Sequence, residues 1–570
     1  MMTPDFKQVI FVPILIGLFF LSPFYSQLNI GGSGLALTYN IATWVMASYL
    51  MAVASLLSLS YKDFTYPYQW PFFLAFPVIV IITSLLSDIN QPITWLFRQL
   101  FILGGLLFLF ALFQFKVKQI QLDKVLFILI IAVGLHALLG AAQIAVPDLI
   151  PSWFSPNLGS VPRGIFQQIN VHVSFLVTGQ MIILYLISRP SFRASTKLMQ
   201  LIVIASFALA TYVTIASGSR VGLLSLILGM PLLLWSRYNQ LRYHKKLLAI
   251  LFIVSCTSIF VGQAGLYKTI DKSVQLSGKS YSTARIAMYT IGLELVAKEP
   301  IYGYGIGGFL KAWNKQSSDF VDRHPETVLP NTTTHPHNEI LFWMIEGGIL
   351  SVIGIVAAII GIILALIQCG FQRGGAYAAM LIPISLHTQV ELPFYISAVH
   401  WFLWLFLIFL VLRHQTKVVT LTLSGAATRS IQGLAIVLAV GVTVFMINTA
   451  RAQTDLYTFL YEPQKAKAPY LQLALNNLYF KPAAERVAMR SMLYVSIENN
   501  DRNKVEIFEN WAQQYVSISP ELKMYEDLIS ASVFLRPDGQ GCDVIKQSLT
   551  MYAHNKPLQQ AYKEKCSMLD

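Results

Sequence analysis

Thirteen predominantly apolar stretches, most of them close to 20 residues long, constrain the fold of this chain more than any other feature. A helix that spans a membrane needs roughly 20 such residues. The chain has 570 residues, is 55% hydrophobic and carries only 12% charged residues, which is far too apolar for a soluble protein. We therefore predict an all-α polytopic integral membrane protein with about 12–13 transmembrane helices. The apolar runs cover residues 8–26, 35–59, 69–87, 97–115, 124–146, 170–188, 200–217, 220–236, 246–262, 340–367, 374–390, 396–413 and 430–449.

The lysines and arginines between these runs predict the orientation of the chain. Short loops after even-numbered runs hold fifteen of them, whereas those after odd-numbered runs hold three: Arg98, Arg163 and Arg220. Cytoplasmic loops of membrane proteins carry such an excess. We therefore predict a cytoplasmic N-terminus, with residues 263–339 and everything after residue 449 on the outer side. The net charge of +13 is mostly these anchors and indicates no nucleic-acid partner.

The same pattern divides the chain into four predicted parts. They are an N-terminal transmembrane bundle (1–262), a large outer loop (263–339), C-terminal transmembrane helices (340–449) and a soluble, helical, repeat-like domain (450–570).

Two details of the outer parts can be predicted further. Ile286, Tyr289, Leu293 and Val296 share one helical stripe of the large loop, which predicts an amphipathic helix at the membrane surface. In the C-terminal part, Cys542 and Cys566 are compatible with a disulfide in an oxidising compartment and equally with two free thiols.

Four polar patches lie on the predicted outer face: "VPRGIFQQIN" (161–170), "ASGSRVG" (216–222), "TARIAMY" (283–289) and "HPHNEIL" (335–341). The first three each bring an arginine, namely Arg163, Arg220 and Arg285, and the fourth brings His335 and His337. The planar fork of arginine suits phosphate oxygens. A histidine can take a proton from a hydroxyl near neutral pH. The patches therefore favour a site that binds a polyanion and supplies a base.

The histidine patch allows more than one interpretation. Asn338 is expected to cap the following helix, so that His337 lies at its positive end, where the neutral imidazole is favoured as a base. A metal pair formed by His335 and His337 has only Glu339 nearby as a third ligand, and we predict no metal. The structural alternatives are that the arginines bind lipid headgroups and that the histidine only shapes the helix mouth.

Three further residues are candidate contacts of an acceptor or a glycan. The segment "HTQVELPFYISAVHW" (387–401) interrupts two apolar runs and brings Glu391, which would orient an arginine or an acceptor, and Tyr395. An aromatic anchor at the membrane edge is the alternative for Tyr395. Gln168 would contact a sugar or bond a neighbouring helix. His335 and Asn338 complete this set of candidate contacts.

Taken in order, "PRGIFQQIN", "SGSRVG", "TARIAMY" with "GYGIGGF", "HPHNEIL" and "ELPFYISAVHW" resemble the bacterial PglL-type O-oligosaccharyltransferases, part of the wider O-antigen ligase and polymerase group. The resemblance covers residues 150–415 and extends to the placement of the C-terminal domain. It implies transfer of a preassembled glycan from undecaprenyl diphosphate to serine or threonine hydroxyls of periplasmic or secreted proteins, pilin among them. It also implies an inner-membrane protein that has its active site in the periplasm and uses no metal or other cofactor.

The resemblance implies roles for individual residues as well. His337 matches the essential histidine of the large periplasmic loop, and Arg163, Arg220 and Arg285 match the arginines that hold the diphosphate. Gln168 matches the glutamine of a G-Q-x-N run, and Tyr395 matches a tyrosine of the late helix pair. Gln167 departs from the pattern, because a glycine is expected there. A base opposite a leaving diphosphate predicts inversion at the anomeric carbon.

Two alternatives remain open. The same core would join O-antigen to lipid A core or polymerise repeat units, with a sugar hydroxyl as acceptor; the soluble C-terminal domain favours a protein acceptor. A transporter of the lipid-linked glycan, which belongs to another class, should place charges at the bilayer midplane and show internal repeats. The charges here gather on one face instead, and no duplicated half is visible in the sequence.

Overall fold

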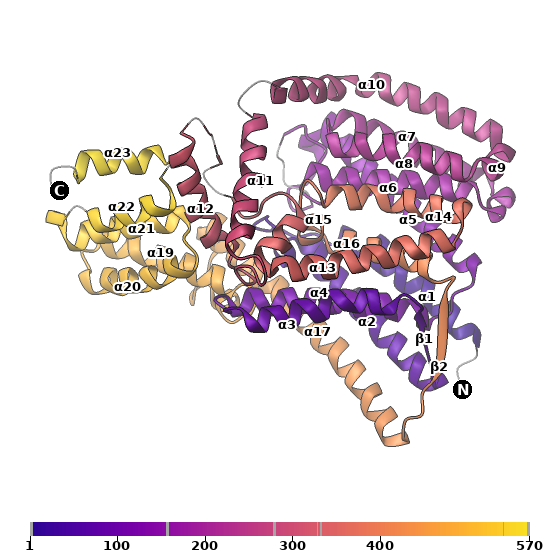
Figure 1. Ribbon diagram of the computed structural model, residues 1–570, viewed down its shortest axis with the longest axis horizontal. Coiled ribbons are helices and arrows are strands. Elements are labelled where there is room, and N and C mark those ends of the chain that lie inside the picture. Colours follow the sequence, from indigo (N-terminus) through magenta and orange to yellow (C-terminus); the bar gives the residue numbers. More distant parts are fainter. Residues whose placement is uncertain are drawn as a thin grey trace. The chain divides into compact units, whose positions relative to one another are not determined.

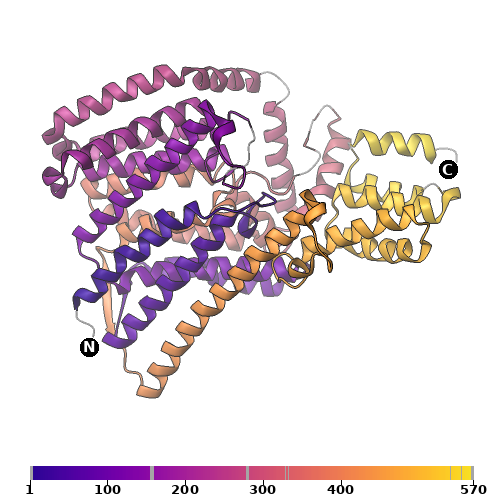
Figure 2. The ribbon, with the colours of Figure 1, turned by 180° about the vertical axis from the view of Figure 1, so that it is seen from behind.

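A computed structural model describes residues 4–154, 159–277, 281–325, 327, 329–330, 333–539, 541–553 and 555–566 (Figures 1 and 2). All thirteen predicted apolar runs lie on helical segments. Nine helices of the described residues are long and apolar enough to cross a membrane, and Trp70–Leu86, Arg220–Ser236 and Ala398–Leu412 are shorter apolar helices. The prediction of an all-α polytopic membrane protein is confirmed.

The chain divides into two compact units. The first unit comprises residues 1–75, 102–272 and 357–470, and the second comprises residues 76–101, 273–356 and 471–570. Four helices contribute a segment to each unit: α3 (Trp70–Leu86), α4 (Pro92–Gln114), α10 (Lys245–Ser277) and α13 (Glu339–Gln368).

The first unit is a bundle of apolar helices. Helix α14 packs against α8 and α6, α5 packs against α6 and α7, and α17 packs along α2 (Figure 1). Its own helices are α1 (Pro4–Ile16), α2 (Thr38–Tyr61), α5 (Gln119–Ala145), α6 (Ile169–Ile187), α7 (Lys197–Ala216), α8 (Arg220–Ser236), α9 (Tyr238–Leu241), α14 (Phe371–His387), α15 (Pro393–Ile396), α16 (Ala398–Leu412) and α17 (Gly425–Tyr461).

The loops that the charge count predicts to be cytoplasmic meet at one end of this bundle. Asp63 lies 3.6 Å from the ammonium group of Lys7 and 2.6 Å from that of Lys116. The sequence did not predict that β1 (Asp63–Pro67) pairs antiparallel with β2 (Thr416–Thr420), which joins two of these loops. Further contacts at this end join Arg189 to Asp123 (3.4 Å), Arg413 to the carbonyl of Val117 (2.9 Å) and Arg237 to Ser188 (2.8 Å).

The remaining loops of the first unit meet one another in the same way, at the opposite ends of the same helices. The contacts join Gln27 to Gln453 (3.1 Å), Asn40 to the carbonyl of Ile396 (2.8 Å), Gln143 to the carbonyl of Gly164 (3.2 Å) and Ser219 to Asn170 (2.8 Å). Successive loops therefore alternate between two ends, as a bundle of spanning helices requires.

Two helices run past the predicted ends of their apolar segments. Helix α10 continues to Ser277, so the first residues assigned to the large loop are helical. Helix α17 continues to Tyr461, beyond the boundary that we placed at residues 449–450. The sequence between residues 449 and 461 contains neither proline nor glycine, and Pro463 is the first residue that cannot continue the helix. Hydropathy falls there before the helix ends.

The second unit contains the large loop and the C-terminal helices. Its own helices are α11 (Tyr281–Lys298), α12 (Phe309–Arg323), α18 (Gln472–Leu475), α19 (Lys481–Glu498), α20 (Arg502–Ile518), α21 (Leu522–Leu535), α22 (Cys542–Met551) and α23 (Lys556–Lys565). Helices α19 to α22 pack pairwise in chain order around a core that includes Phe508, Tyr525 and Leu528 (Figure 2).

The predicted loop helix forms as α11, but it is apolar on two faces. Ile286 and Leu293 of the predicted stripe are exposed. A second face that the stripe did not include, with Met288, Ile291 and Leu295, is buried in the protein. Helix α11 therefore packs as part of the second unit and still presents an apolar stripe outward.

Cys542 and Cys566 form a disulfide that ties α23 to α22 and leaves Cys256 and Cys369 as free thiols. The bridge closes a loop with a sequence separation of 24 residues. Closing a loop of this size typically stabilises a fold by about 3 kcal/mol.

We therefore expect Cys542→Ser with Cys566→Ser to lower the free energy of unfolding of the C-terminal helices by about 3 kcal/mol. Pulse proteolysis of the full-length protein across a urea series measures this change. The control is Cys256→Ser, which removes a free thiol. An unchanged cleavage midpoint in the double variant would show that the bridge contributes nothing.

Candidate functional site

The segment that carries Arg163 and Gln168 is held firmly at the start of α6. The side-chain amide of Gln143 donates to the carbonyl of Gly164 (3.2 Å) and accepts from its N–H (2.7 Å). One ring nitrogen of His172 lies 2.9 Å from the carbonyl of Pro162. Gly164 has a φ of +58°, and a Cβ there would lie 2.7 Å from the His172 ring, so only glycine fits this turn.

Phe166 anchors the same segment, because its ring packs among four other aromatic rings. It is fully buried, and its ring lies 5.0 Å from those of His136 and His400. The rings of Tyr39 and Phe175 lie 5.4 Å from that of Phe166. The close approach of so many rings fixes the backbone on both sides of Phe166, including Arg163 and Gln168. The sequence pattern gave no role to Phe166.

Gln167 shows how the departure from glycine is accommodated. Its φ is +59°, which is the left-handed region that glycine occupies most easily. Its side-chain amide donates to Asn29 Oδ1 (3.2 Å), which compensates part of the backbone strain. The next residue, Gln168, is the N-cap of α6, and its Oε1 is buried without a hydrogen-bond partner in the described part of the chain.

The two arginine patches of the first unit meet at the N-termini of α6 and α8. Ser219, the N-cap of α8, donates to Asn170 Oδ1 in the first turn of α6 (2.8 Å). Arg220 follows Ser219 and is exposed, whereas Arg163 is partly buried. Backbone N–H groups at a helix N-terminus carry partial positive charge. Two such ends make this region suited to an anion with several oxygens, and the two segments that meet here each carry an arginine.

Glu391 and Tyr395 lie in the same unit. Glu391 is buried, and its backbone N–H donates to the carbonyl of His387 (3.0 Å) at the end of α14. Tyr395 lies in the short helix α15 and is partly buried. The carbonyl of Ile396 accepts from the Tyr39 hydroxyl (3.0 Å), which fixes this turn against α2.

The histidine patch lies in the second unit, immediately before α13. Asn338 Oδ1 accepts from the N–H of Leu341 (2.9 Å), so Asn338 caps the helix as predicted. His335 Nδ1 accepts from the N–H of His337 (3.2 Å), and the two rings lie 4.4 Å apart. His337 has a φ of +53°, a strained conformation for a residue with a side chain. Strain of this kind gathers at functional sites.

Arg285 lies on α11, in the same unit as the histidines, and is exposed. Helix α11 touches the first turn of α13, since a Cβ added at Gly292 would meet the Leu341 side chain at 2.8 Å. Arg285 is two helical turns from this contact. The second unit thus contains Arg285, His335, His337 and Asn338, and the first contains Arg163, Gln168, Arg220, Glu391 and Tyr395.

The glycine-rich segment "IYGYGIGGF" packs against the N-terminal part of α13. Helix α13 is kinked at Gly348, where φ is +66°. The N–H of Ile349 and the carbonyl of Ile345 lose their mutual helical bond there and pair instead with Pro300 and Tyr304, each at 2.9 Å. A Cβ at Gly348 would lie 2.0 Å from the carbonyl of Ile301, so the close approach requires glycine.

An ion pair between Arg98 and Glu346 lies beside the contact of residues 300–307 with α13, and this region is called the joint below. Glu346 Oε2 lies 3.2 Å from the Arg98 guanidinium, with only 2% of the Glu346 side chain exposed. Its Oε1 accepts from the N–H of Gly307 (3.0 Å). Arg98, one of the three arginines in the short loops predicted on the outer side, therefore has a structural partner. The visible signal was Glu346 itself, a carboxylate inside the apolar run "LFWMIEGGIL".

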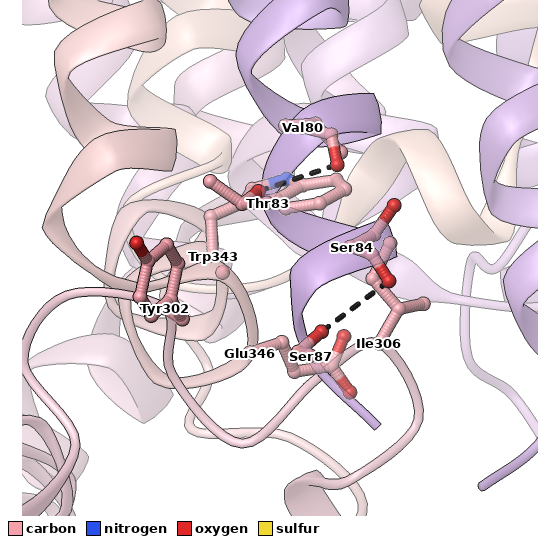
Figure 3. A pocket seen from close by; sticks show the side chains of 9 residues that line it. Val80, Thr83, Ser84, Ser87, Tyr302, Ile306, Trp343 and Glu346 are labelled. Atoms are coloured by element: carbon pink, nitrogen blue, oxygen red, sulfur yellow. Dashed lines mark hydrogen bonds between the residues drawn. The ribbon is translucent and has the colours of Figure 1, made fainter. Parts of the chain in front are cut away.

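A small hollow lies beside this joint, between α3 and α13 (Figure 3). Thr83 and Ser84 of α3 and Ser87 just after it line one side, and Trp343 and Glu346 line it from α13. The hydroxyls of Thr83 and Ser87 donate to main-chain carbonyls of their own helix (3.2 and 3.4 Å). Its space of about 180 Å³ includes open solvent and leaves no room for a water molecule, so this hollow is too small for a small-molecule site.

Comparisons with known proteins place two domains on the chain. Residues 205–356 match the O-antigen ligase family, Wzy_C. Residues 376–566 match Wzy_C_2, described as the C-terminal part of virulence factor membrane-bound polymerases. One segment of the chain is thus similar to a ligase family and a later segment to a polymerase family. No curated protein matches it.

The two domains divide the candidate residues between them. The ligase-type domain contains Arg220, Arg285 and the histidine patch, whereas the polymerase-type domain contains Glu391, Tyr395 and nearly all of the C-terminal helices. Arg163 and Gln168 precede both. In these two segments the chain is similar to the wider ligase and polymerase group that the motifs resemble, and its apolar helices are those of a multi-pass membrane protein.

Proposed function

We propose that the protein is an O-linked oligosaccharyltransferase. It moves a preassembled glycan from undecaprenyl diphosphate to serine or threonine hydroxyls of periplasmic or secreted proteins. The observation that carries this proposal is the junction of the α6 and α8 N-termini at Asn170 and Ser219, which joins the segments that carry Arg163 and Arg220. Such a region suits a diphosphate, and the lipid part of the donor would reach it from the bilayer.

The reaction needs a base and an anion site but no metal. An imidazole nitrogen of His337 takes the proton of the acceptor hydroxyl while its oxygen attacks the anomeric carbon. The bond from that carbon to the phosphate oxygen breaks, and undecaprenyl diphosphate leaves with its charge held by arginines, including Arg285. Attack from the opposite face inverts the anomeric carbon, and a retained configuration in the product linkage, assigned by NMR, would contradict it. The proton then passes to solvent.

The proposed location is the bacterial inner membrane, with the active site and C-terminal domain in the periplasm. Two observations support it. The loops rich in lysine and arginine share one end of the first unit, which the positive-inside rule assigns to the cytoplasm. The Cys542–Cys566 disulfide belongs to an oxidising compartment, which the periplasm is.

Arg220→Gln is expected to lower kcat/KM for the lipid-linked donor by roughly 10- to 150-fold, the loss of one or two charge-assisted hydrogen bonds. Arg163→Gln should act in the same direction. Lysine at either position should restore only part of the activity, because it lacks the planar fork. The assay uses purified protein, the lipid-linked glycan and an acceptor over a donor concentration series.

The control for this experiment is Arg242→Gln. Arg242 is exposed and lies after α9, in a loop of the predicted cytoplasmic side. Its replacement should leave kcat/KM unchanged. If Arg220→Gln and Arg242→Gln have the same effect, Arg220 does not hold the diphosphate.

A second candidate function is transfer of the same glycan to a sugar hydroxyl, either in lipid A core or in a growing O-antigen. The descriptions of both matched families favour it, because they name a ligase and a polymerase. The donor site and the base would be the same. Only the chemical nature of the acceptor separates the two candidates.

A further inference from the structure

Helix α12 of the large loop lies against three other parts of the second unit. Its first residue, Phe309, packs edge-on against Phe342 in the first turn of α13, with ring centres 5.4 Å apart. Gln316 in its middle donates to the carboxylate of Glu294 on α11. Helix α12 also packs against α22 of the C-terminal helices. Helix α12 therefore connects α13, α11 and the C-terminal helices within the unit.

Asn314 makes the central contact with the C-terminal helices. Its side chain is 3% exposed, and its Nδ2 donates to both the carbonyl of Pro520 (2.9 Å) and the hydroxyl of Tyr552 (2.8 Å). The Tyr552 hydroxyl itself donates to the Pro520 carbonyl (2.6 Å). Burial raises the pKa of Tyr552, so this hydroxyl stays protonated and able to donate. The three groups form a closed, satisfied network.

Ser318 repeats the contact one helical turn later. Its Oγ accepts from the N–H of Ala553 (2.8 Å), in the turn that follows α22. Asn314 and Ser318 are four residues apart and so lie on the same face of α12. Lys311 and Lys315, by contrast, belong to the exposed face of the helix. The buried polar face of α12 therefore forms hydrogen bonds with residues of the C-terminal domain.

A close-packed helix passes a displacement at one contact on to its others, because the interior leaves no space to absorb it. The contacts run without a gap from Pro520 and Tyr552 through Asn314 to Phe309 and then to Phe342 on α13. Phe342 is five residues from His337, and its N–H donates to the carbonyl of Asn338 (2.9 Å).

We propose that Asn314 is a positioning residue, and that the C-terminal domain holds the start of α13, and with it His337, in place through α12. The part of this inference that concerns catalysis rests on the proposed function of His337. The mechanical coupling does not. The C-terminal domain is then a working part of the catalytic unit rather than a module attached for acceptor binding alone.

Hydrogen exchange of the full-length protein in lipid nanodiscs tests the coupling. Asn314→Leu removes both donors but leaves the bond between Tyr552 and Pro520, so the C-terminal helices keep their own network. We expect exchange to quicken by roughly tenfold or more in residues 308–323 and also in residues 339–345. Lys315→Ala, on the exposed face next to Asn314, should change neither segment. Faster exchange in residues 308–323 alone would overturn the coupling.

The milder variant Ser318→Ala keeps the test decisive if Asn314→Leu does not fold. It should quicken exchange in the same two segments to a smaller extent. The absence of any change in residues 339–345 in this variant would overturn the proposal equally.

Kinetics test the consequence for His337. Asn314→Leu should lower kcat roughly tenfold and change KM for the lipid-linked donor much less, because Arg163 and Arg220, two of the three proposed diphosphate ligands, belong to the first unit. Tyr552→Phe should act in the same direction, and the double variant should lose no more than Asn314→Leu alone. A rise in KM with an unchanged kcat would overturn the positioning role. If the wild type transfers no glycan, the proposed function fails, while the exchange result still decides the coupling.

Discussion

Replacing His337 with asparagine is expected to lower the rate of glycan transfer 10²- to 10⁴-fold, which is the usual contribution of a general base. Asparagine is the sharpest choice, because it adopts the left-handed backbone that His337 occupies (φ +53°) more readily than most residues. The variant therefore removes the base and keeps the turn. Single-turnover kinetics with saturating donor measure the chemical step directly.

The matched control is His335→Asn. His335 Nδ1 accepts from the N–H of His337 (3.2 Å), and an asparagine side-chain oxygen makes the same bond to the N–H two residues later. We expect this variant to retain the rate of transfer to within about tenfold. Equal losses in the two variants would mean that the patch serves only to shape the loop, and that the base lies elsewhere.

Glu346→Ala is expected to lower the free energy of unfolding by about 3–5 kcal/mol, since it removes a buried carboxylate that is ion-paired with the largely buried Arg98 guanidinium. The N–H of Gly307 would lose its acceptor as well. Denaturant titration of the purified protein in one fixed detergent measures the effect. Because the joint supports the start of α13, we also expect slower transfer in this variant.

The combined variant Arg98→Met with Glu346→Leu separates the two causes of this loss. Replacing both partners of a buried ion pair by apolar residues is often neutral. We expect the double variant to recover most of the stability that Glu346→Ala loses. A double variant as unstable as the single one would show that the hydrogen bond to Gly307, and not the ion pair, holds the joint.

The membrane helices could be predicted from the sequence because each one is specified locally. An apolar run of sufficient length has one stable form in a bilayer, since its backbone must bond within itself. The alternation of charged loops between two ends then follows from the number of runs. The cap at Asn338 is equally local, because the capping side chain and the N–H it bonds are three residues apart.

Features that depend on distant contacts could not be predicted. Helix α12 is polar along much of its length, and only its packing against α11, α13 and the C-terminal helices explains why one polar face is buried. Helices α10 and α17 continue beyond the predicted apolar runs, because hydropathy falls before the helix ends. The pairing of β1 with β2 joins segments about 350 residues apart in the sequence, too far for any local pattern.

In the candidate site, too, local features could be predicted and features that depend on distant contacts could not. The residue types and their order pointed to an anion site with a base. The bond between Asn170 and Ser219, which joins two of the patches, requires the packing of α6 against α8 and is invisible in the sequence. Gln167 was singled out as a departure from glycine, and its left-handed backbone supplies the physical reason that glycine is suited to that position.

The most direct test of the account is the intact mass of secreted acceptor proteins. The protein would be expressed in a periplasm-bearing host that makes a lipid-linked glycan, either as wild type or as the His337→Asn variant. The account predicts a gain of one glycan mass on serine or threonine of an acceptor with the wild type, and none with the variant. Unmodified proteins, with the glycan found instead on lipopolysaccharide or grown in length, would contradict protein O-glycosylation and favour the ligase or polymerase function.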